Sequence, residues 1–173
     1  MNKFNLSDEV YNEFYGSYVS LLNDDQLMDL FKDGRDEFIS FIENIPGDLF
    51  FSSYSKGKWT IAEVLVHVID AERVFQYRAL RFLRNDKTSL PGFDQDDFVL
   101  HCNANSRSKK SIIEEYRTVR AATISLFSGL DDDMLRREGT ASNIKWSVAV
   151  LGFVICGHQK HHQLILEQKY MPA

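Results

Sequence analysis

Cysteine and proline are scarce in this chain. Its 173 residues include two cysteines, Cys102 and Cys156, which fit no CxxC spacing, and three prolines. Nothing in this pattern indicates a disulfide framework, so we expect both thiols to be reduced. Because so few prolines interrupt the chain, long helices can form.

Excess positive charge and long apolar runs are also lacking. The formal net charge is -5, which disfavours nonspecific binding to nucleic acid or anionic membranes, because both need a basic surface. The longest uncharged run, Trp146 to Gln159, has about 14 residues and is too short to span a bilayer. The first residues, MNKFNLSDEV, lack the basic and apolar regions of a secretory signal. We therefore expect a cytoplasmic protein that binds a small molecule, with no nucleic acid and no membrane as partner.

The chain does contain enough apolar residues for one core. With 44% hydrophobic content, residues 1–173 are expected to form a single domain. Apolar residues recur at helical spacing, and Thr60 and Glu63 form a capping-box pattern ahead of one such segment. The expected helices are a short one over about 7–22 and long ones over about 24–44, 60–84, 108–127 and 147–169.

No segment shows the clean alternation of apolar and polar residues that marks a strand. The sequence therefore predicts an all-α fold, a four-helix bundle. About 23 residues connect the second long helix to the third, more than neighbours in simple up-and-down order require. A connection of this length can cross the bundle, which permits an up-down-down-up order.

Three histidines lie close together near the C-terminus, in GHQKHH. His158 and His162 are four residues apart on the apolar face of their helix, so both imidazoles should point inward. His67 falls on the apolar side of the second long helix. If that helix and the fourth are antiparallel, His67 and His162 lie at the same level, about 10 Å from the neighbouring helix ends. The three imidazoles could then converge on one zinc, nickel or iron(II) ion and leave coordination positions open.

Simpler interpretations remain for each residue. A lone buried histidine such as His67 is more often a hydrogen-bonded core residue than a ligand. His161 points about 60° away from His158 and is expected at a rim, whereas His101 is expected at the surface. Glu72 and Asp70 could serve as a general base, but a solvated or ion-paired helix carboxylate is the ordinary alternative.

The motifs also resemble those of a known family. GKWTIAEVLVHVIDAERVFQYRALRFLRNDKTSLPGFDQDDFV, then GLDDDMLRREGTASN and finally GHQKHH are similar in order and separation to the DinB-like family, also called DinB/YfiT-like metalloenzymes. The resemblance covers about Tyr11 to Tyr170. It implies an up-down-down-up bundle, often a homodimer, that holds one divalent metal ion with His67, His158 and His162.

The resemblance implies a function less narrowly than a fold. Some relatives are S-transferases that use bacillithiol, mycothiol or glutathione, and others are described as metal-dependent hydrolases. We expect a metal-dependent S-transferase that joins a low-molecular-weight thiol to an electrophilic small molecule, with a hydrolase or a non-catalytic, stress-associated metal-binding bundle as alternatives. Gln159 and Gln95 stand where relatives often carry acidic residues. His161, Glu72 and Gln159 are the candidates for contacts around the three ligands.

Overall fold

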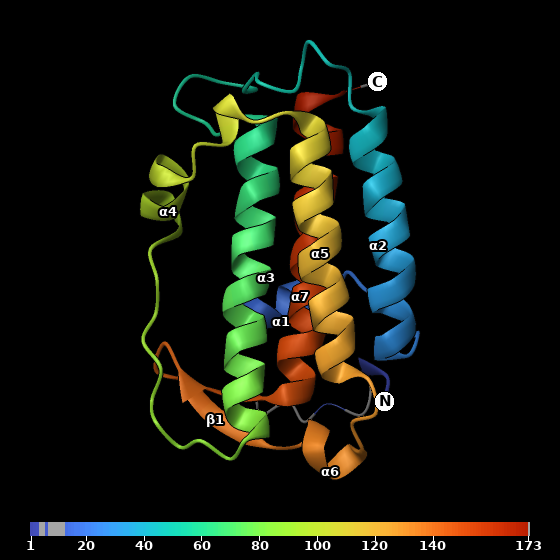
Figure 1. Ribbon diagram of the computed structural model, residues 1–173, viewed down its shortest axis with the longest axis vertical. Helices are drawn as coiled ribbons and strands as arrows, with labels where there is room; N and C mark the ends of the chain where they lie inside the picture. Colours follow the sequence, from blue (N-terminus) through green and yellow to red (C-terminus); the bar gives the residue numbers. More distant parts are fainter. Residues whose placement is uncertain (4–5, 7–12, 173) are drawn as a thin grey trace.

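Four long helices dominate the computed structural model, which describes residues 1–3, 6 and 13–172 (Figure 1). They are α2 (Leu27–Asn44), α3 (Ile61–Leu83), α5 (Lys109–Phe127) and α7 (Val148–Ile165). The colours in Figure 1 show that α2 and α7 run in one direction and α3 and α5 in the other. The predicted all-α four-helix bundle with up-down-down-up order is confirmed.

Side-chain caps fix where three of these helices begin. The Thr60 hydroxyl accepts a hydrogen bond from the Glu63 amide at 3.2 Å, and the Glu63 carboxylate accepts one from the Thr60 amide at 2.7 Å, which is the predicted capping box. Ser108 and Ser147 cap α5 and α7 with their hydroxyls. A π-helical turn, Leu166–Tyr170, extends α7, so the helical run ends close to the predicted residue 169.

Shorter elements lie outside the four long helices. α1 spans Glu13–Val19 within the predicted segment 7–22, of which residues 7–12 lie outside the described part of the chain. α2 begins at Leu27 rather than near residue 24. The long connection after α3 contains α4 (Gln95–His101) and a 3-10 turn, and α6 (Asp132–Leu135) follows α5.

A small β-hairpin was not predicted from the sequence. β1 (Glu138–Ala141) pairs in antiparallel fashion with β2 (Ile144–Ser147). Ser142 and Asn143 form the turn with φ angles of 53° and 60°, and positive φ at both central residues is typical of tight hairpin turns. Four residues per strand are too few to reveal a period of two in a sequence.

The core fills the space between the four long helices. Its largest side chains, each at most 2% exposed, include Phe31, Phe38, Phe82, Trp146, Phe153, Ile42 and Ile69. Both cysteines are free, as predicted. Among the described residues, none of the helices combines the length and the apolar character needed to cross a membrane.

Candidate metal centre

His67 on α3 and His158 and His162 on α7 bring their imidazoles together between the two helices. The Nε2 atom of His158 lies 3.1 Å from Nε2 of His67 and 3.1 Å from Nε2 of His162. Potential ligand atoms of all three residues lie within 4.8 Å of one another. α3 and α7 are antiparallel (Figure 1), which is the arrangement that the matching of helix levels required.

Burial keeps the three imidazoles uncharged near neutral pH. It lowers the pKa of His67 to about 4, and together with the neighbouring His67 and His161 it lowers the pKa of His162 to about 3. Burial and the neighbouring imidazoles also lower the pKa of His158. A neutral imidazole nitrogen carries either one proton or one lone pair, so Nε2 of His158 cannot make a full hydrogen bond to both neighbours. A central cation would accept all three lone pairs.

The donor set fits a divalent transition metal. Bonds of 2.0–2.1 Å in tetrahedral geometry place ligand nitrogens about 3.3 Å apart, close to the two separations of 3.1 Å found between the Nε2 atoms. Within the described part of the chain, the group contains three histidines and no fourth side chain. Three protein ligands leave a coordination position free for water or substrate, as in catalytic zinc sites.

A cavity of about 260 Å³ adjoins the three imidazoles. Its aromatic wall consists of Phe14, Tyr15, Tyr18, Phe75 and Phe93. Its other polar side chains are Arg78, Gln95, Ser142 and His161. None of the described residues that line it is Asp or Glu. Among the described residues, a small molecule in this cavity would therefore meet imidazoles, aromatic rings and one guanidinium, but no carboxylate.

His162 also lines a second, wider cavity of about 540 Å³. Tyr54, Trp59 and Tyr170 supply its aromatic walls, and Asp96 supplies its one carboxylate among the described residues. The Trp59 ring lies 4.9 Å from the ring of His67. The imidazole cluster is thus approached from two cavities of different character.

The remaining two histidines, His161 and His101, lie outside the imidazole cluster. His161 is half-buried, with its ring 5.0 Å from that of Tyr18 and 5.1 Å from that of His162, at the edge of the first cavity. His101 is exposed, and its Nδ1 lies 2.8 Å from the backbone carbonyl oxygen of Asp97. His101 does not belong to the imidazole cluster.

Glu72 and Gln159 make their hydrogen bonds away from the imidazoles. Arg120 donates to both carboxylate oxygens of Glu72, at 2.8 and 2.9 Å, and Thr123 donates to one of them at 2.7 Å. Gln159 accepts from Arg120 at 2.7 Å and from Tyr116 at 2.5 Å. Glu72 is therefore a buried ion-pair partner that links α3 to α5. Asp70 faces a different cation, with its carboxylate 3.4 Å from Arg73.

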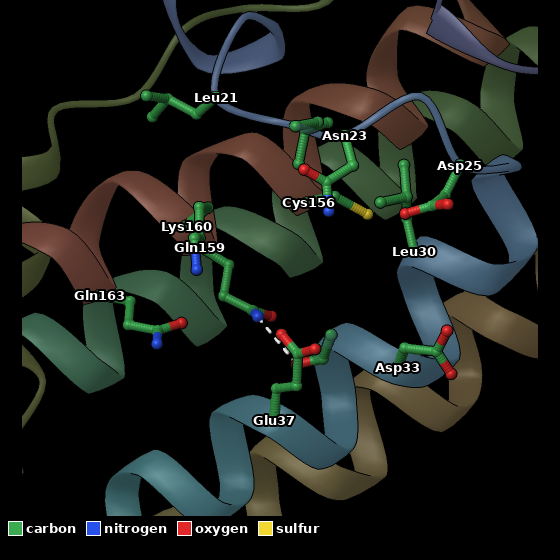
Figure 2. A pocket seen from close by; sticks show the side chains of 12 residues that line it. Leu21, Asn23, Asp25, Leu30, Asp33, Glu37, Cys156, Gln159, Lys160 and Gln163 are labelled. Atoms are coloured by element: carbon green, nitrogen blue, oxygen red, sulfur yellow. Dashed lines mark hydrogen bonds between the residues drawn. The ribbon is translucent and has the colours of Figure 1, made fainter.

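A further cavity of about 210 Å³ lies between α2 and α7 and contains no histidine (Figure 2). It is lined by Asp33 and Glu37 of α2 and by Lys160 and Gln163 of α7, and the dashed line in Figure 2 marks the bond from Gln159 Nε2 to the Gly34 carbonyl, 2.9 Å long. Cys156 lies at its base, where burial raises the pKa of the thiol to about 12. A thiol with that pKa is a poor nucleophile at neutral pH.

Comparisons with known proteins agree with this architecture. A family model described as the DinB superfamily matches residues 30–166. No functionally curated protein matches the chain. Among solved structures the fold is similar to one described as "YfiT from Bacillus subtilis is a probable metal-dependent hydrolase with an unusual four-helix bundle topology". The TM-score is 0.69 at 12% identity, over 95% of this chain and 90% of that chain. The chain belongs to the DinB superfamily.

Proposed function

We propose that this protein is a metal-dependent enzyme in which His67, His158 and His162 hold one divalent ion at the wall of a substrate cavity. The observation that carries the proposal is the convergence of three uncharged Nε2 atoms beside a cavity of about 260 Å³. A purely structural metal site usually closes all four positions with side chains. Here three side chains meet, and the space beside them is open to a small molecule.

The reaction that we favour is the transfer of a low-molecular-weight thiol to an electrophilic small molecule. A bound divalent ion would supply Lewis acidity, which lowers the pKa of a thiol or a water molecule that reaches it. A free thiol has a pKa of about 8.5 and water one of about 15.7. The described residues of the first cavity include no carboxylate that could accept a proton. A thiol, whose pKa is closer to neutral than that of water, is therefore the nucleophile that the metal could activate most easily.

Hydrolysis is the second candidate, and two observations favour it. The similar structure YfiT is described as a probable metal-dependent hydrolase. Asp96 lines the second cavity together with His162, where a carboxylate could accept a proton from water. The cytoplasmic location, the homodimer and the single-domain organisation expected from the sequence remain predictions.

Metal content tests the ligand assignment. Untagged protein would be purified without a nickel column and analysed by elemental mass spectrometry beside His67→Ala and His162→Ala. We expect wild type to contain about one zinc, nickel or iron ion per chain and both variants to lose most of it. The matched control, His101→Ala, removes an exposed imidazole outside the cluster and should retain the ion. Equal metal content in all four proteins would overturn the assignment.

Activity assays distinguish the two reactions. The metal-loaded protein would be given chlorodinitrobenzene or monochlorobimane with cysteine, glutathione or bacillithiol, and then nitrophenyl esters without any thiol. S-transfer predicts turnover that requires a thiol and disappears in His158→Ala. Turnover of esters that falls by 100-fold or more in Asp96→Asn would instead support hydrolysis. Metal bound at the cluster with neither activity would support the non-catalytic alternative.

A further inference from the structure

Arg78 is a buried cation in the cavity that adjoins the imidazole cluster. Its side chain is 2% exposed, and it lines the cavity together with His67, His158 and His162. Within the described part of the chain no carboxylate lies within ion-pair distance of it. A buried charge without a counter-ion is costly, so its presence here requires an explanation.

Arg120 provides a comparison within the same protein. Both guanidinium groups are buried, but Arg120 donates to both oxygens of Glu72. Burial alone would lower the pKa of Arg120, yet the charge of Glu72 raises it above its usual value. For Arg78, burial lowers the pKa, and the group that opposes this shift is the Tyr15 hydroxyl rather than a carboxylate. Among the described residues, Arg120 therefore has a carboxylate partner and Arg78 has none.

In the described part of the chain, the Arg78 guanidinium is held through a single nitrogen, Nη2. Nη2 donates to the Ser142 hydroxyl at 2.9 Å and to the Pro91 carbonyl at 3.3 Å. Ser142 lies in the turn of the β-hairpin, and its amide donates to the Leu90 carbonyl at 3.0 Å. Nε and Nη1 of Arg78 donate no hydrogen bond to any other described residue. The hairpin and the long connection thus orient the guanidinium of a residue that lines the cavity.

The distance between Arg78 and the imidazoles suits a small ligand. The Arg78 guanidinium carbon lies 5.7 Å from the centre of the Phe75 ring, and that ring lies 6.3 Å from the ring of His158. The guanidinium is therefore at most about 12 Å from His158. At roughly 30 Å³ for each water molecule, a cavity of about 260 Å³ accommodates about nine waters, or a molecule with about ten non-hydrogen atoms.

We propose that Arg78 binds an oxyanion group of the substrate, so that the cavity selects small anionic molecules whose reactive end reaches the imidazole cluster. Charge-assisted hydrogen bonds from Nε and Nη1 would hold a carboxylate or a phosphorus oxyanion. The aromatic rings of Tyr15, Phe75 and Phe93 would cover the apolar part of the molecule. This inference deepens the proposed function by naming the substrate class, but the anion site itself does not require a bound metal.

Matched pairs of probes test the anion site by equilibrium binding. The probes are 3-phenylpropanoate and benzylphosphonate, which carry the two kinds of oxyanion, and the neutral 3-phenylpropanamide. Each would be titrated into zinc-loaded and metal-free protein and followed by calorimetry and by the NMR signals of Phe75. The variants are Arg78→Met and Ser142→Ala. Arg81→Met is the control, because Arg81 lies on the same helix and carries the same charge but pairs with Asp86 outside the cavity.

We expect at least one of the two anions to bind wild type more tightly than the amide. Arg78→Met should weaken the binding of that anion by about tenfold or more, because one or two charge-assisted hydrogen bonds are lost. It should leave the affinity for the amide unchanged. Ser142→Ala should lower the affinity for the anion by a smaller factor, and Arg81→Met should leave that affinity unchanged. If Arg78→Met does not fold, the Ser142→Ala result decides. The anion that binds more tightly identifies the kind of oxyanion.

Three outcomes would overturn the anion site. They are binding of neither anion to wild type, equal affinities for an anion and the amide, and loss of binding in Arg81→Met equal to that in Arg78→Met. Anion binding that depends on Arg78 in metal-free protein would support the site even if the metal assays failed. A protein that binds metal and turns over neutral electrophiles only would retain the proposed function and lose this inference.

Discussion

Removing the charge of Arg120 should destabilise the protein by about 3–5 kcal/mol, and removing Glu72 as well should restore most of that loss. The two side chains are 0% and 2% exposed. Arg120→Met leaves the Glu72 carboxylate in the core with Thr123 as its remaining donor. Glu72→Met leaves the Arg120 guanidinium with the Gln159 and Phe31 oxygens as its acceptors among the described residues. Either variant leaves a full charge buried in a low dielectric medium without its ion-pair partner.

The double variant leaves few polar groups without a partner. Gln159 still accepts from Tyr116 at 2.5 Å, and its amide still donates to Gly34. Thr123 still donates to the Val119 carbonyl at 3.2 Å. Replacing a buried ion pair by apolar side chains of similar volume is often neutral or stabilising. We expect the double variant to lie within about 2 kcal/mol of wild type, which, with about 3–5 kcal/mol lost in each single variant, gives a coupling energy of at least about 4 kcal/mol.

Urea unfolding of the four metal-free proteins, followed by far-UV circular dichroism, measures this coupling. Arg73→Met is the control, because Arg73 forms a half-exposed pair with Glu115 and should cost less than about 1 kcal/mol. Additive losses, with the double variant as unstable as the two single variants together, would refute the reasoning.

Two further predictions concern the imidazole cluster and the helix that covers it. Because the pKa of His67 is about 4 when folded and about 6.5 when unfolded, the unfolded chain binds more protons at acid pH. The stability contributed by neutral His67 is complete above pH 6.5, and chelator-treated protein should lose about 2 kcal/mol of it between pH 7.5 and 5. His67→Ala should remove that part of the urea-derived pH dependence, while the buried His158 and His162 keep theirs. Gly157→Ala should lower the free energy of unfolding by about 1–3 kcal/mol, because its new Cβ would lie 2.3 Å from the Tyr18 carbonyl oxygen. Gly34→Ala should raise it by up to about 1 kcal/mol, because the nearest atom to its new Cβ would be 3.6 Å away. A gain for both, in the same urea measurement, would contradict the close contact of α1 with α7.

The parts of the fold that the sequence predicted depend on local patterns. The capping box at Thr60 involves residues three apart, and the pair His158 and His162 involves residues four apart. Spacing alone decides which helix face such residues share. The partnership of His67 with that pair spans 91 residues. This partnership could still be predicted, because the single assumption that the two helices are antiparallel places His67 and His162 at the same level.

The residues that were missed or misplaced depend on partners far away in the sequence. Glu72 finds Arg120 from 48 residues away, and nothing in the spacing of either residue indicates this pair. Arg78 left a weak signal, because it lies on the apolar stripe of α3 between Phe75 and Phe82, where a charge is unexpected. The role proposed for Arg78 depends on the hairpin turn, because Ser142, its hydrogen-bond partner, lies 64 residues away in the sequence.

The buried polar network also explains how the imidazoles can be positioned before any ion binds. Arg120 on α5 bonds to Glu72 on α3 and to Gln159 on α7 at the same time, so the three helices are tied at one height. Gln159 directly follows His158, and a slide of α7 by one turn, about 5.4 Å, would break both Arg120 bonds. Apolar packing resists such a slide less specifically than directional bonds to a buried charge do. The height of His158 relative to His67 is therefore fixed by a network that contains no ligand, and a metal ion would find its three nitrogens already assembled.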